Sequence, residues 1–291
     1  GEGAAAPAAV SGGDTAWLFY SSGTTGRPKG VMLTHDNLRA MSLAYALDVD
    51  QAAPDQATIY AAPISHGAGL YNFVFVRAGG AHVFPVSKGF DPAEIAALSR
   101  HFGQTVMFAA PTMVKRLVEW ARGAGYRGEG IRTVVYGGGP MYLADIEDAL
   151  ALFGPRFVQI YGQAESPMTI TSLRRELIAD RTHPDHARRR ASVGQAMATV
   201  EVAIAGPDGR PDAAVGEPGE ILVRGETVMK GYWNNAQATA ATLAHGWLHT
   251  GDVGMLDADG FLMLTDRSKD VIISGGTNIY PREVEEVLAR H

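Results

Sequence analysis

The strongest constraint on the fold of this chain is a regular alternation of short apolar runs with amphipathic stretches between residues 15 and 173. The apolar runs include AWLFY, VMFAA, TVVYGGG and FVQIYG, and the amphipathic stretches include DPAEIAALSRHF, TMVKRLVEWARG and LADIEDALALF. Short β-rich runs separated by amphipathic helices of this length are typical of βαβ units around a parallel sheet. The sequence therefore predicts an α/β fold with a mostly parallel sheet and flanking helices.

One of the predicted helices carries a complete start signal. In DPAEIAAL, Asp91 stands at the N-cap position, Pro92 at the first helical position and Glu94 in the first turn. An N-cap carboxylate accepts hydrogen bonds from the free backbone N–H groups, and proline is tolerated where no N–H is needed. We expect a helix that begins at Pro92.

The pattern changes after Ala191, where short alternating segments such as VEVAIAG, GEILVRG and FLMLTD are separated by PDG, EPGE and ADG turns. Such segments predict antiparallel strands with tight turns, arranged as a small barrel or a distorted sheet. The last stretch, YPREVEEVLARH, predicts a helix from Pro281. We expect a linker over residues 1–14, an α/β subdomain over 15–190, an antiparallel β subdomain over 191–266, and a hinge with the start of a further domain over 267–291.

Composition excludes several classes of protein. The 291 residues are 46% hydrophobic, enough for a buried core, and the formal net charge is −6 without a long basic run, which argues against nucleic-acid binding. The absence of cysteine removes disulfides, thiolate nucleophiles and cysteine-based zinc sites. No apolar run approaches the roughly 20 residues of a membrane span. The opening GEGAAAPAAVSGGD does not resemble a secretory signal, so we expect a cytoplasmic protein.

The segment RRELIADRTHPDHARRR separates the two patterns and is rich in charge. His183 and His186 stand three residues apart in it, which would suit a metal site, but no further ligands lie nearby in the sequence. We therefore expect a solvated surface loop.

The loop YSSGTTGRPKGV, residues 20–31, follows the first apolar run and is crowded with glycine and small hydroxyl residues. Glycines allow close approach of the backbone, and neighbouring N–H groups and hydroxyls can surround one anion, so this composition suits phosphate. The spacing to Lys29 does not match the P-loop of ordinary nucleotide hydrolases, which disfavours a simple ATPase, and no dinucleotide GxGxxG is present. A flexible loop is the alternative.

Further segments downstream favour the phosphate interpretation. They are YGQAE (Tyr161 to Glu165), HTGD (ending at Asp252) and DRSKDVIISGGTNIYPREVE (Asp266 to Glu285). Together with YSSGTTGRPKG, and in this order, they resemble successive signatures of the acyl-activating, AMP-forming enzymes, which include acyl- and aryl-CoA synthetases, luciferases and peptide-synthetase adenylation domains. RSKDVIISGGTNIYP is most similar to the fatty and aryl acid ligases.

The resemblance implies a two-step reaction with ATP, Mg²⁺ and CoA. A carboxylate attacks the α-phosphorus of ATP to give an acyl-adenylate and pyrophosphate, and a thiol, usually that of CoA, then displaces AMP. This chemistry needs a cradle for the phosphates, a divalent cation, a ribose anchor and an apolar acyl pocket.

The resemblance assigns candidate residues to the phosphates and the cation. Lys29, Thr25 and Glu165 are the expected catalytic residues, and Glu165 is the expected Mg²⁺ ligand, since Mg²⁺ takes one or two carboxylates with substrate phosphate oxygens. Family members usually have Thr where this chain has Ala164, which removes one hydroxyl contact to the α-phosphate. The predicted phosphate-binding residues are Ser21, Ser22, Gly23, Thr24, Thr25 and Lys29.

The resemblance also assigns the nucleoside and the hinge. Gly137 to Gly139 would line one side of the adenine and Tyr161 the other, while Asp252 would accept from the ribose hydroxyls. Lys269 matches the family's hinge, and Gly275 and Gly276 fit the loop beside the pantetheine tunnel. The predicted AMP-binding residues are Gly137, Gly138, Gly139, Tyr161, Gly162, Gln163, Ala164, Asp252 and Arg267.

The acyl pocket is assigned from APISHGAGL, which ends at Leu70 and resembles the segment whose histidine flanks the carboxylate. The candidates are His66, Ala68, Gly69 and Met168, and small residues at Ala68 and Gly69 would leave room for a fatty acyl chain or a ring. Met141 and Pro167 could extend the wall, although apolar residues of this kind are more often core. We expect a carboxylic acid, of fatty acyl type, as substrate.

The departures from the family concern the two ends of the chain. Family members have further sequence before the first motif and a small C-terminal domain after the last one, which supplies a lysine for the first step. We therefore expect this chain to bind nucleotide but to adenylate poorly, and to expose an apolar face that favours self-association. The alternatives are a module that loads a carrier-protein thiol and a catalytically weak nucleotide-binding fragment.

Overall fold

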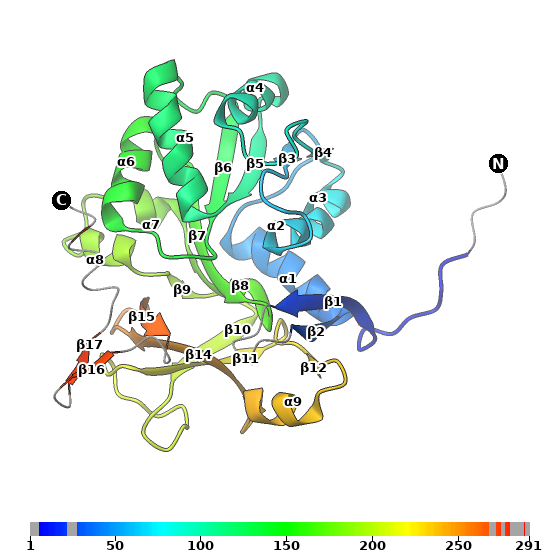
Figure 1. The fold of residues 1–291 in the computed structure, drawn as a ribbon, viewed down its shortest axis with the longest axis vertical. Helices are drawn as coiled ribbons and strands as arrows, with labels where there is room; N and C mark the ends of the chain where they lie inside the picture. The colour runs from blue at the N-terminus through cyan, green and yellow to red at the C-terminus, as the bar shows by residue number, and fades with distance from the viewer. Residues whose placement is uncertain (1–5, 22–27, 268–271, 275–276, 280–287, 289–291) are drawn as a thin grey trace.

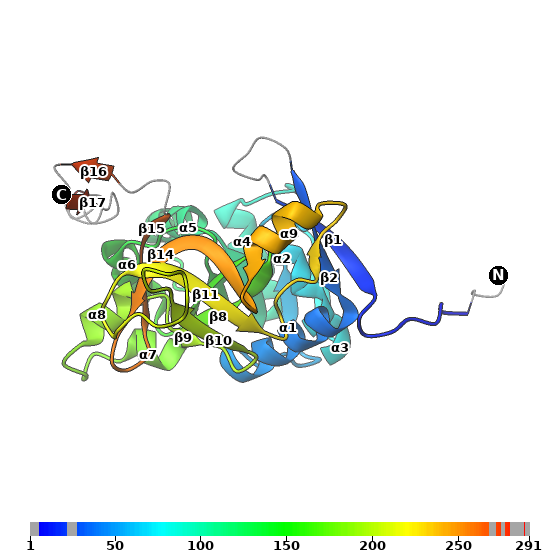
Figure 2. The same ribbon diagram turned by 90° about the horizontal axis from the view of Figure 1, so that it is seen from below.

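The computed structural model describes residues 6–21, 28–267, 272–274, 277–279 and 288. Residues 6–10 form neither helix nor strand, and Figures 1 and 2 show them extending away from the rest of the chain. The helix expected from Pro281 lies outside the described residues, apart from Leu288. None of the described helices is both long enough and apolar enough to cross a bilayer.

The main element is a seven-stranded sheet with the strand order β4-β3-β5-β6-β7-β8-β9. Strands β4, β3, β5, β6 and β7 are parallel, whereas β8 and β9 are antiparallel to their neighbours. The predicted α/β class with a mostly parallel sheet is therefore confirmed. The strands are β3 (Ala57–Ile59), β4 (Ala81–Val83), β5 (Thr105–Ala109), β6 (Ile131–Tyr136), β7 (Phe157–Gln163), β8 (Ser166–Leu173) and β9 (Gln195–Ala196).

Helices cover both faces of this sheet (Figure 1). Successive side chains of a strand point to opposite faces, so Val106 of β5 packs in the same core as helices α1 and α3, while Met107 packs in the core of α4 to α6. The first face has α1 (His35–Asp48), α2 (Gly67–Leu70) and α3 (Asn72–Ala78), and the second has α4 (Pro92–Phe102), α5 (Pro111–Ala124) and α6 (Leu143–Phe153).

The predicted start of α4 is confirmed. The Asp91 side chain accepts a hydrogen bond from the Glu94 backbone N–H at 2.8 Å, and Pro92 occupies the first helical position. The helix ends at Gly103, which adopts the left-handed conformation with φ 76° that glycine tolerates best.

The run AWLFY does not join the parallel sheet, contrary to the simple alternation expected from the sequence. It forms β1 (Thr15–Ser21), which pairs antiparallel with β2 (Lys29–Thr34), and β2 pairs with β12 (Gly231–Tyr232). Only residues 22–28 separate β1 from β2, which is too short for a parallel crossover of about a dozen residues. The pairing with β12 brings Tyr232, from far along the chain, opposite Val31 of the strand that begins at Lys29.

The second half of the chain forms an open antiparallel sheet with the path β10-β11-β14-β13, and β15 pairs with β14 (Figure 2). Register shifts interrupt β11 and β14, and within the described residues the sheet does not close into a barrel. Of the two expected arrangements, the distorted sheet is the one found. The elements are β10 (Val200–Ile204), β11 (Gly219–Gly225), α9 (Ala236–Thr242), β13 (Leu243–Ala244), β14 (Trp247–Leu256) and β15 (Leu262–Arg267).

The charged segment before this sheet is not the solvated loop that the sequence predicted. It contains α7 (Arg175–Ala179) and α8 (His186–Ala191), and the Arg190 side chain is buried. The Arg190 guanidinium donates to the carbonyls of Ile178 at 2.6 Å and Asp180 at 3.2 Å. These carbonyls belong to the end of α7, where backbone acceptors lack partners within the helix, so the arginine is buried because it satisfies them.

Candidate active site

The candidate residues converge because parallel strands end at the same edge of their sheet. The segment that contains His66 follows β3, Gly137 to Gly139 follow β6, and Ala164 with Glu165 follow β7. In open α/β sheets, ligands bind outside the carboxyl ends of the strands. The motifs of the predicted acyl, adenine and cation sites therefore lie at one edge.

Glu165 is held in place by contacts on both its backbone and its side chain. The carboxylate is buried, with 8% of the residue exposed, and its Oε1 accepts a hydrogen bond of 2.6 Å from the Tyr232 hydroxyl. The Glu165 carbonyl accepts from the Met229 N–H at 2.8 Å. Among the described residues, Oε2 has no hydrogen-bond donor. One oxygen is thus fixed by the protein and the other is left for a ligand.

Tyr232 also contacts Lys29. The Lys29 Nζ lies 4.8 Å from the centroid of the Tyr232 ring, within the range of a cation–π interaction. Burial, and then the neighbouring Glu165 carboxylate, raise the pKa of Tyr232, so the phenol stays protonated and remains a donor. Sequence analysis missed Tyr232, because an aromatic residue in a short strand carries no signal that separates it from the core.

The donor set around Glu165 fits Mg²⁺. The described residues contain no group of three or more His, Cys, Asp or Glu side chains that could enclose a metal. Mg²⁺ typically keeps waters and binds one or two carboxylates plus substrate phosphates rather than a protein cage. A single carboxylate with one open oxygen suits that mode. In the described part of the chain, His183 and His186 form hydrogen bonds within their own turn, to Asp185 and to each other.

Tyr161 and Asp252 link the main sheet to the antiparallel sheet. The Tyr161 hydroxyl donates to the Asp252 Oδ2 at 2.7 Å, and the Gln163 side chain donates to the Thr250 carbonyl at 3.2 Å. Burial, and then the charge of Asp252, raise the pKa of Tyr161 well above its ordinary value. Asp252 pairs with Arg267 in the register of β14 and β15. Both predicted nucleoside residues therefore lie at the junction of the two sheets.

The HTGD segment lies inside β14, where its register with β11 shifts, and it is shaped by a residue that sequence analysis did not identify, Glu220 of β11. Its Oε1 accepts from the Gly251 N–H at 2.9 Å, and its Oε2 lies 2.8 Å from the His249 Nδ1. Gly251 has φ 73°, a conformation that side chains other than glycine rarely adopt. Glu220 thus holds the irregular part of β14 that presents Asp252.

Two further predicted segments lie at the carboxyl edge of the parallel sheet: the glycine turn after β6 and the end of β7. Gly137 is buried, whereas Gly138 and Gly139 are exposed. Ala164 is partly buried against the core of the α1 to α3 face. A Cβ on Gly162 would lie 2.4 Å from the backbone N of Met168, so the β7–β8 turn closes tightly here.

The predicted acyl residues occupy different environments. The exposed His66 ring stacks on Phe19, with centroids 5.6 Å apart and planes 9° apart. Ala68 is buried, and Gly69 does not leave the expected space, because a Cβ there would lie 1.7 Å from the Ile64 carbonyl oxygen. Met168 is buried with φ 63°. Met141 and Pro167 are also buried.

The remaining predicted residues lie at the ends of strands or outside the described residues. Ser21 ends β1 and pairs with Lys29 in the strand register, and Arg267 ends β15. The following candidates lie outside the described residues: Ser22, Gly23, Thr24, Thr25, Lys269, Gly275 and Gly276.

Known proteins that resemble this chain are enzymes that bind AMP or form CoA thioesters. The family model described as AMP-binding enzyme matches residues 2–233. A feruloyl-CoA synthase from an Amycolatopsis species is 39% identical over 277 residues, which cover 94% of this chain and 54% of that protein. A medium/long-chain fatty acid–CoA ligase of Mycobacterium tuberculosis is 35% identical over 275 residues, which cover 94% of this chain and 46% of that protein.

A solved structure gives the same result for the fold. The O-succinylbenzoate Coenzyme A synthetase of Bacillus subtilis, in complex with ATP and a magnesium ion, superposes with a TM-score of 0.83 at 34% identity. The match covers 99% of this chain and 58% of that one. The chain thus spans about half the length of the proteins it matches.

Proposed function

The chain belongs to the AMP-binding enzyme family, and from that membership we propose that it is the nucleotide- and acyl-binding part of an acid–thiol ligase. In the first step, an oxygen of the substrate carboxylate bonds to the α-phosphorus of ATP, and the bond to the β-phosphate bridging oxygen breaks to release pyrophosphate. In the second step, the sulfur of CoA bonds to the acyl carbon, the bond from that carbon to the phosphate oxygen of AMP breaks, and AMP and the thiol proton are released.

The observation that carries this proposal is that Glu165 follows β7, while Tyr161 of the same strand holds Asp252 of β14. Glu165 presents one open carboxylate oxygen, and Asp252 is fixed by the Tyr161 hydroxyl at 2.7 Å. A carboxylate is a strong acceptor for ribose hydroxyls, and charge-assisted hydrogen bonds are the stronger ones. A cation ligand at the end of β7 and a ribose acceptor bonded to the same strand suit a nucleoside triphosphate.

Each described residue has a separate part in the proposed first step. Lys29 supplies positive charge over the ring of Tyr232, whose hydroxyl holds Glu165, and the Gly137 to Gly139 turn and Tyr161 border the base. Glu165 would hold Mg²⁺ through the oxygen that Tyr232 leaves free. When bound, the cation neutralises phosphate charge as the pyrophosphate leaves.

The observations above limit the identity of the carboxylic acid substrate and of the thiol acceptor less than that of the nucleotide. One relative named above is a feruloyl-CoA synthase and the other is a fatty acid–CoA ligase. The fatty acid substrate expected from the sequence therefore stays a prediction. CoA is the proposed acceptor because their names specify CoA thioesters. Loading of a carrier-protein thiol is the alternative. The cytoplasmic location and the self-association expected from the sequence also stay predictions.

Calorimetric titration of the chain with ATP and Mg²⁺ tests the nucleotide site without requiring turnover. We expect binding that weakens by about 10- to 100-fold in Asp252→Asn, because a charged acceptor becomes a neutral amide. ATP lacking the 2′- or 3′-hydroxyl should bind the parent chain more weakly than ATP does. The variant should discriminate much less between these nucleotides.

Asp148→Asn is the matched control, since Asp148 pairs with Arg122 on the exposed surface of α5 and α6. It should bind ATP like the parent chain. A folded chain that does not bind ATP with Mg²⁺ would contradict the proposal, and equal binding by Asp252→Asn would remove Asp252 from the site. CoA binding in the presence of AMP would favour CoA over a carrier protein as acceptor.

A further inference from the structure

The segment of residues 226–232 leads from the end of β11 into β12 and holds Glu165. Its Met229 N–H donates to the Glu165 carbonyl at 2.8 Å, and its Tyr232 hydroxyl donates to the Glu165 Oε1 at 2.6 Å. Before β12 the segment is neither helix nor strand, so a regular ladder of backbone hydrogen bonds does not fix it there. The orientation of the proposed cation ligand therefore depends on what anchors this segment.

Asn37, in the first turn of α1, is one such anchor. Its Nδ2 donates to the carbonyl of Glu226 at 2.7 Å and to the carbonyl of Val228 at 3.0 Å. Its Oδ1 accepts from the Thr34 N–H at 2.9 Å. A carboxamide suits this arrangement, because one of its ends accepts a hydrogen bond and the other donates two. The start of α1 and the segment are thus joined through a single side chain.

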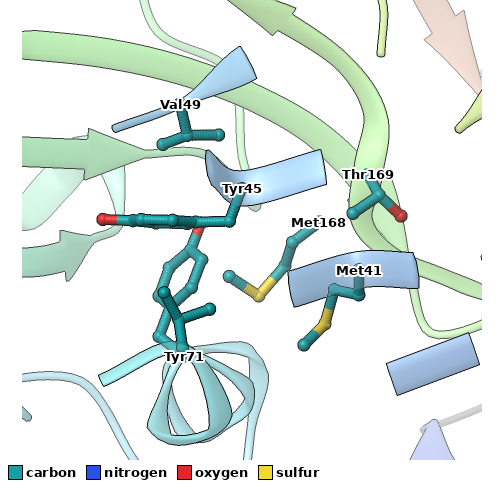
Figure 3. A pocket seen from close by; sticks show the side chains of 7 residues that line it. Met41, Tyr45, Val49, Tyr71, Met168 and Thr169 are labelled. Atoms are coloured by element: carbon teal, nitrogen blue, oxygen red, sulfur yellow. The ribbon is translucent and has the colours of Figure 1, made fainter. Parts of the chain in front are cut away.

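Helix α1 is packed tightly against β8, the strand that begins directly after Glu165 (Figure 3). Asn37, Met41 and Tyr45 are spaced by four residues, so they lie along one face of the helix. Figure 3 shows the Met168 side chain of β8 between the side chains of Met41 and Tyr45, and the space between the packed side chains does not admit a water molecule. Asn37 therefore extends from a helix that is fixed relative to the strand after Glu165.

Two further contacts fix the segment to β8 and to β2. The hydroxyls of Ser166 and Thr227 lie 2.9 Å apart, and both residues are buried. The Lys230 N–H donates to the Met32 carbonyl at 3.0 Å, in the strand that begins at Lys29. The segment thus bridges the strand of the proposed phosphate-binding lysine and the strand after the proposed cation ligand.

We propose that Asn37 is a positioning residue for the cation. It anchors segment 226–232, and that segment orients the Glu165 carboxylate toward Mg²⁺. Both N–H groups of the Asn37 amide bond to the segment, so its effect on the cation passes through Met229 and Tyr232. The inference rests on the proposed function and adds to it a residue that lies outside the predicted motifs.

Asn37→Asp is the variant that tests this role. An aspartate keeps an oxygen that can accept from the Thr34 N–H, and a carboxylate in the first turn favours the helix, so α1 should still form. The variant turns the donor that faces the Glu226 and Val228 carbonyls into an acceptor, which repels them. The Mg²⁺ concentration that gives half-maximal ATP binding in calorimetry should rise by about 10-fold, at the lower end of the effect of groups that orient metal ligands.

AMP binding separates positioning of the cation from a general structural role. AMP lacks the β- and γ-phosphates, and its ribose is expected at Asp252, which lies on β14 rather than on the anchored segment. Asn37→Asp should therefore bind AMP as tightly as the parent chain does. Raising the Mg²⁺ concentration should restore its binding of ATP.

Two further variants serve as comparisons. Asp91→Ala is the matched control for stability, because Asp91 caps α4 on the other face of the sheet. It should lower the melting temperature and leave the Mg²⁺ requirement unchanged. Asn37→Ser removes the Nδ2 donors without adding a charge, so it should raise the Mg²⁺ requirement as Asn37→Asp does.

The outcomes distinguish this inference from the proposed function. An unchanged Mg²⁺ requirement in folded Asn37→Asp, an equal loss of AMP binding, or an equal rise of the requirement in Asp91→Ala would overturn the inference alone. Failure of both Asn37 variants to fold would also overturn it, since the amide would then support the fold as a whole. A folded parent chain that does not bind ATP with Mg²⁺ would overturn the proposed function as well.

Discussion

Replacing Tyr232 with Phe tests whether this tyrosine positions Glu165. The ring and its contact with the Lys29 ammonium are kept, and only the hydroxyl that donates to the Glu165 carboxylate at 2.6 Å is lost. A hydrogen bond to a charged group contributes about 1.5–3 kcal/mol, and here the carboxylate that loses its donor is buried. We expect the free energy of unfolding to fall by about 2 kcal/mol.

Urea unfolding followed by circular dichroism measures this change. The matched control is Tyr136→Phe, since Tyr136 is fully buried and donates to the neutral Gln159 Oε1 at 3.1 Å. A neutral pair contributes about 1 kcal/mol, so the control should lose roughly half as much stability. If Tyr232→Phe loses no more stability than Tyr136→Phe, the charge-assisted bond to Glu165 has been overestimated.

The same pair of variants tests the link to Mg²⁺. Removing a group that orients a metal ligand typically costs about 10- to 100-fold in metal affinity. The Mg²⁺ concentration that gives half-maximal ATP binding should therefore rise by that factor in Tyr232→Phe and stay unchanged in Tyr136→Phe. An unchanged Mg²⁺ requirement in both variants would refute a positioning role for Tyr232.

Three further predictions concern the surrounding scaffold. Asp50→Asn should lower the free energy of unfolding by about 1–3 kcal/mol in urea, because the partly exposed Arg132 and Arg175 guanidinium groups lose their buried carboxylate partner. Glu220→Ala should cost about 1–3 kcal/mol in the same assay and weaken ATP binding, since the Gly251 N–H loses its hydrogen bond to Glu220 and the HTGD segment of β14 loses that support. Burial raises the pKa of Tyr60 to about 12; an unfolded tyrosine ionises near pH 10, so stability should fall as the pH rises from about 10 to about 12, and less steeply in Tyr60→Phe.

The sequence by itself determined the features that depend on neighbours along the chain. The start of α4 at Pro92 follows from Asp91, Pro92 and Glu94 within one turn, and the apolar runs marked strands β5, β6 and β7. The order of the motifs identified the family, which the family match over residues 2–233 confirms. These signals are local, because capping and the alternation of side chains involve residues within a few positions of each other.

The tertiary structure alone decided which distant residues meet. Tyr232 lies 67 residues from Glu165, and Asp252 lies 91 residues from Tyr161, yet both pairs are hydrogen-bonded. The first pair depends on β12 joining β2 in a sheet that the alternation of apolar runs did not predict. Nothing in the local pattern fixes such partners, since the free energy that favours them comes from burial and strand pairing across the whole fold.

The buried polar groups also show which features the sequence determines and which depend on the tertiary structure. Arg190 stands in a run of charges that predicts a solvated loop, but the carbonyls at the end of α7 hold its side chain inside. Tyr45 and Tyr71 are typical core residues in the sequence, and only the structure shows that their hydroxyls lack partners. Whether a polar group is satisfied depends on the atoms that surround it in three dimensions, and a sequence pattern records only which residue types are buried.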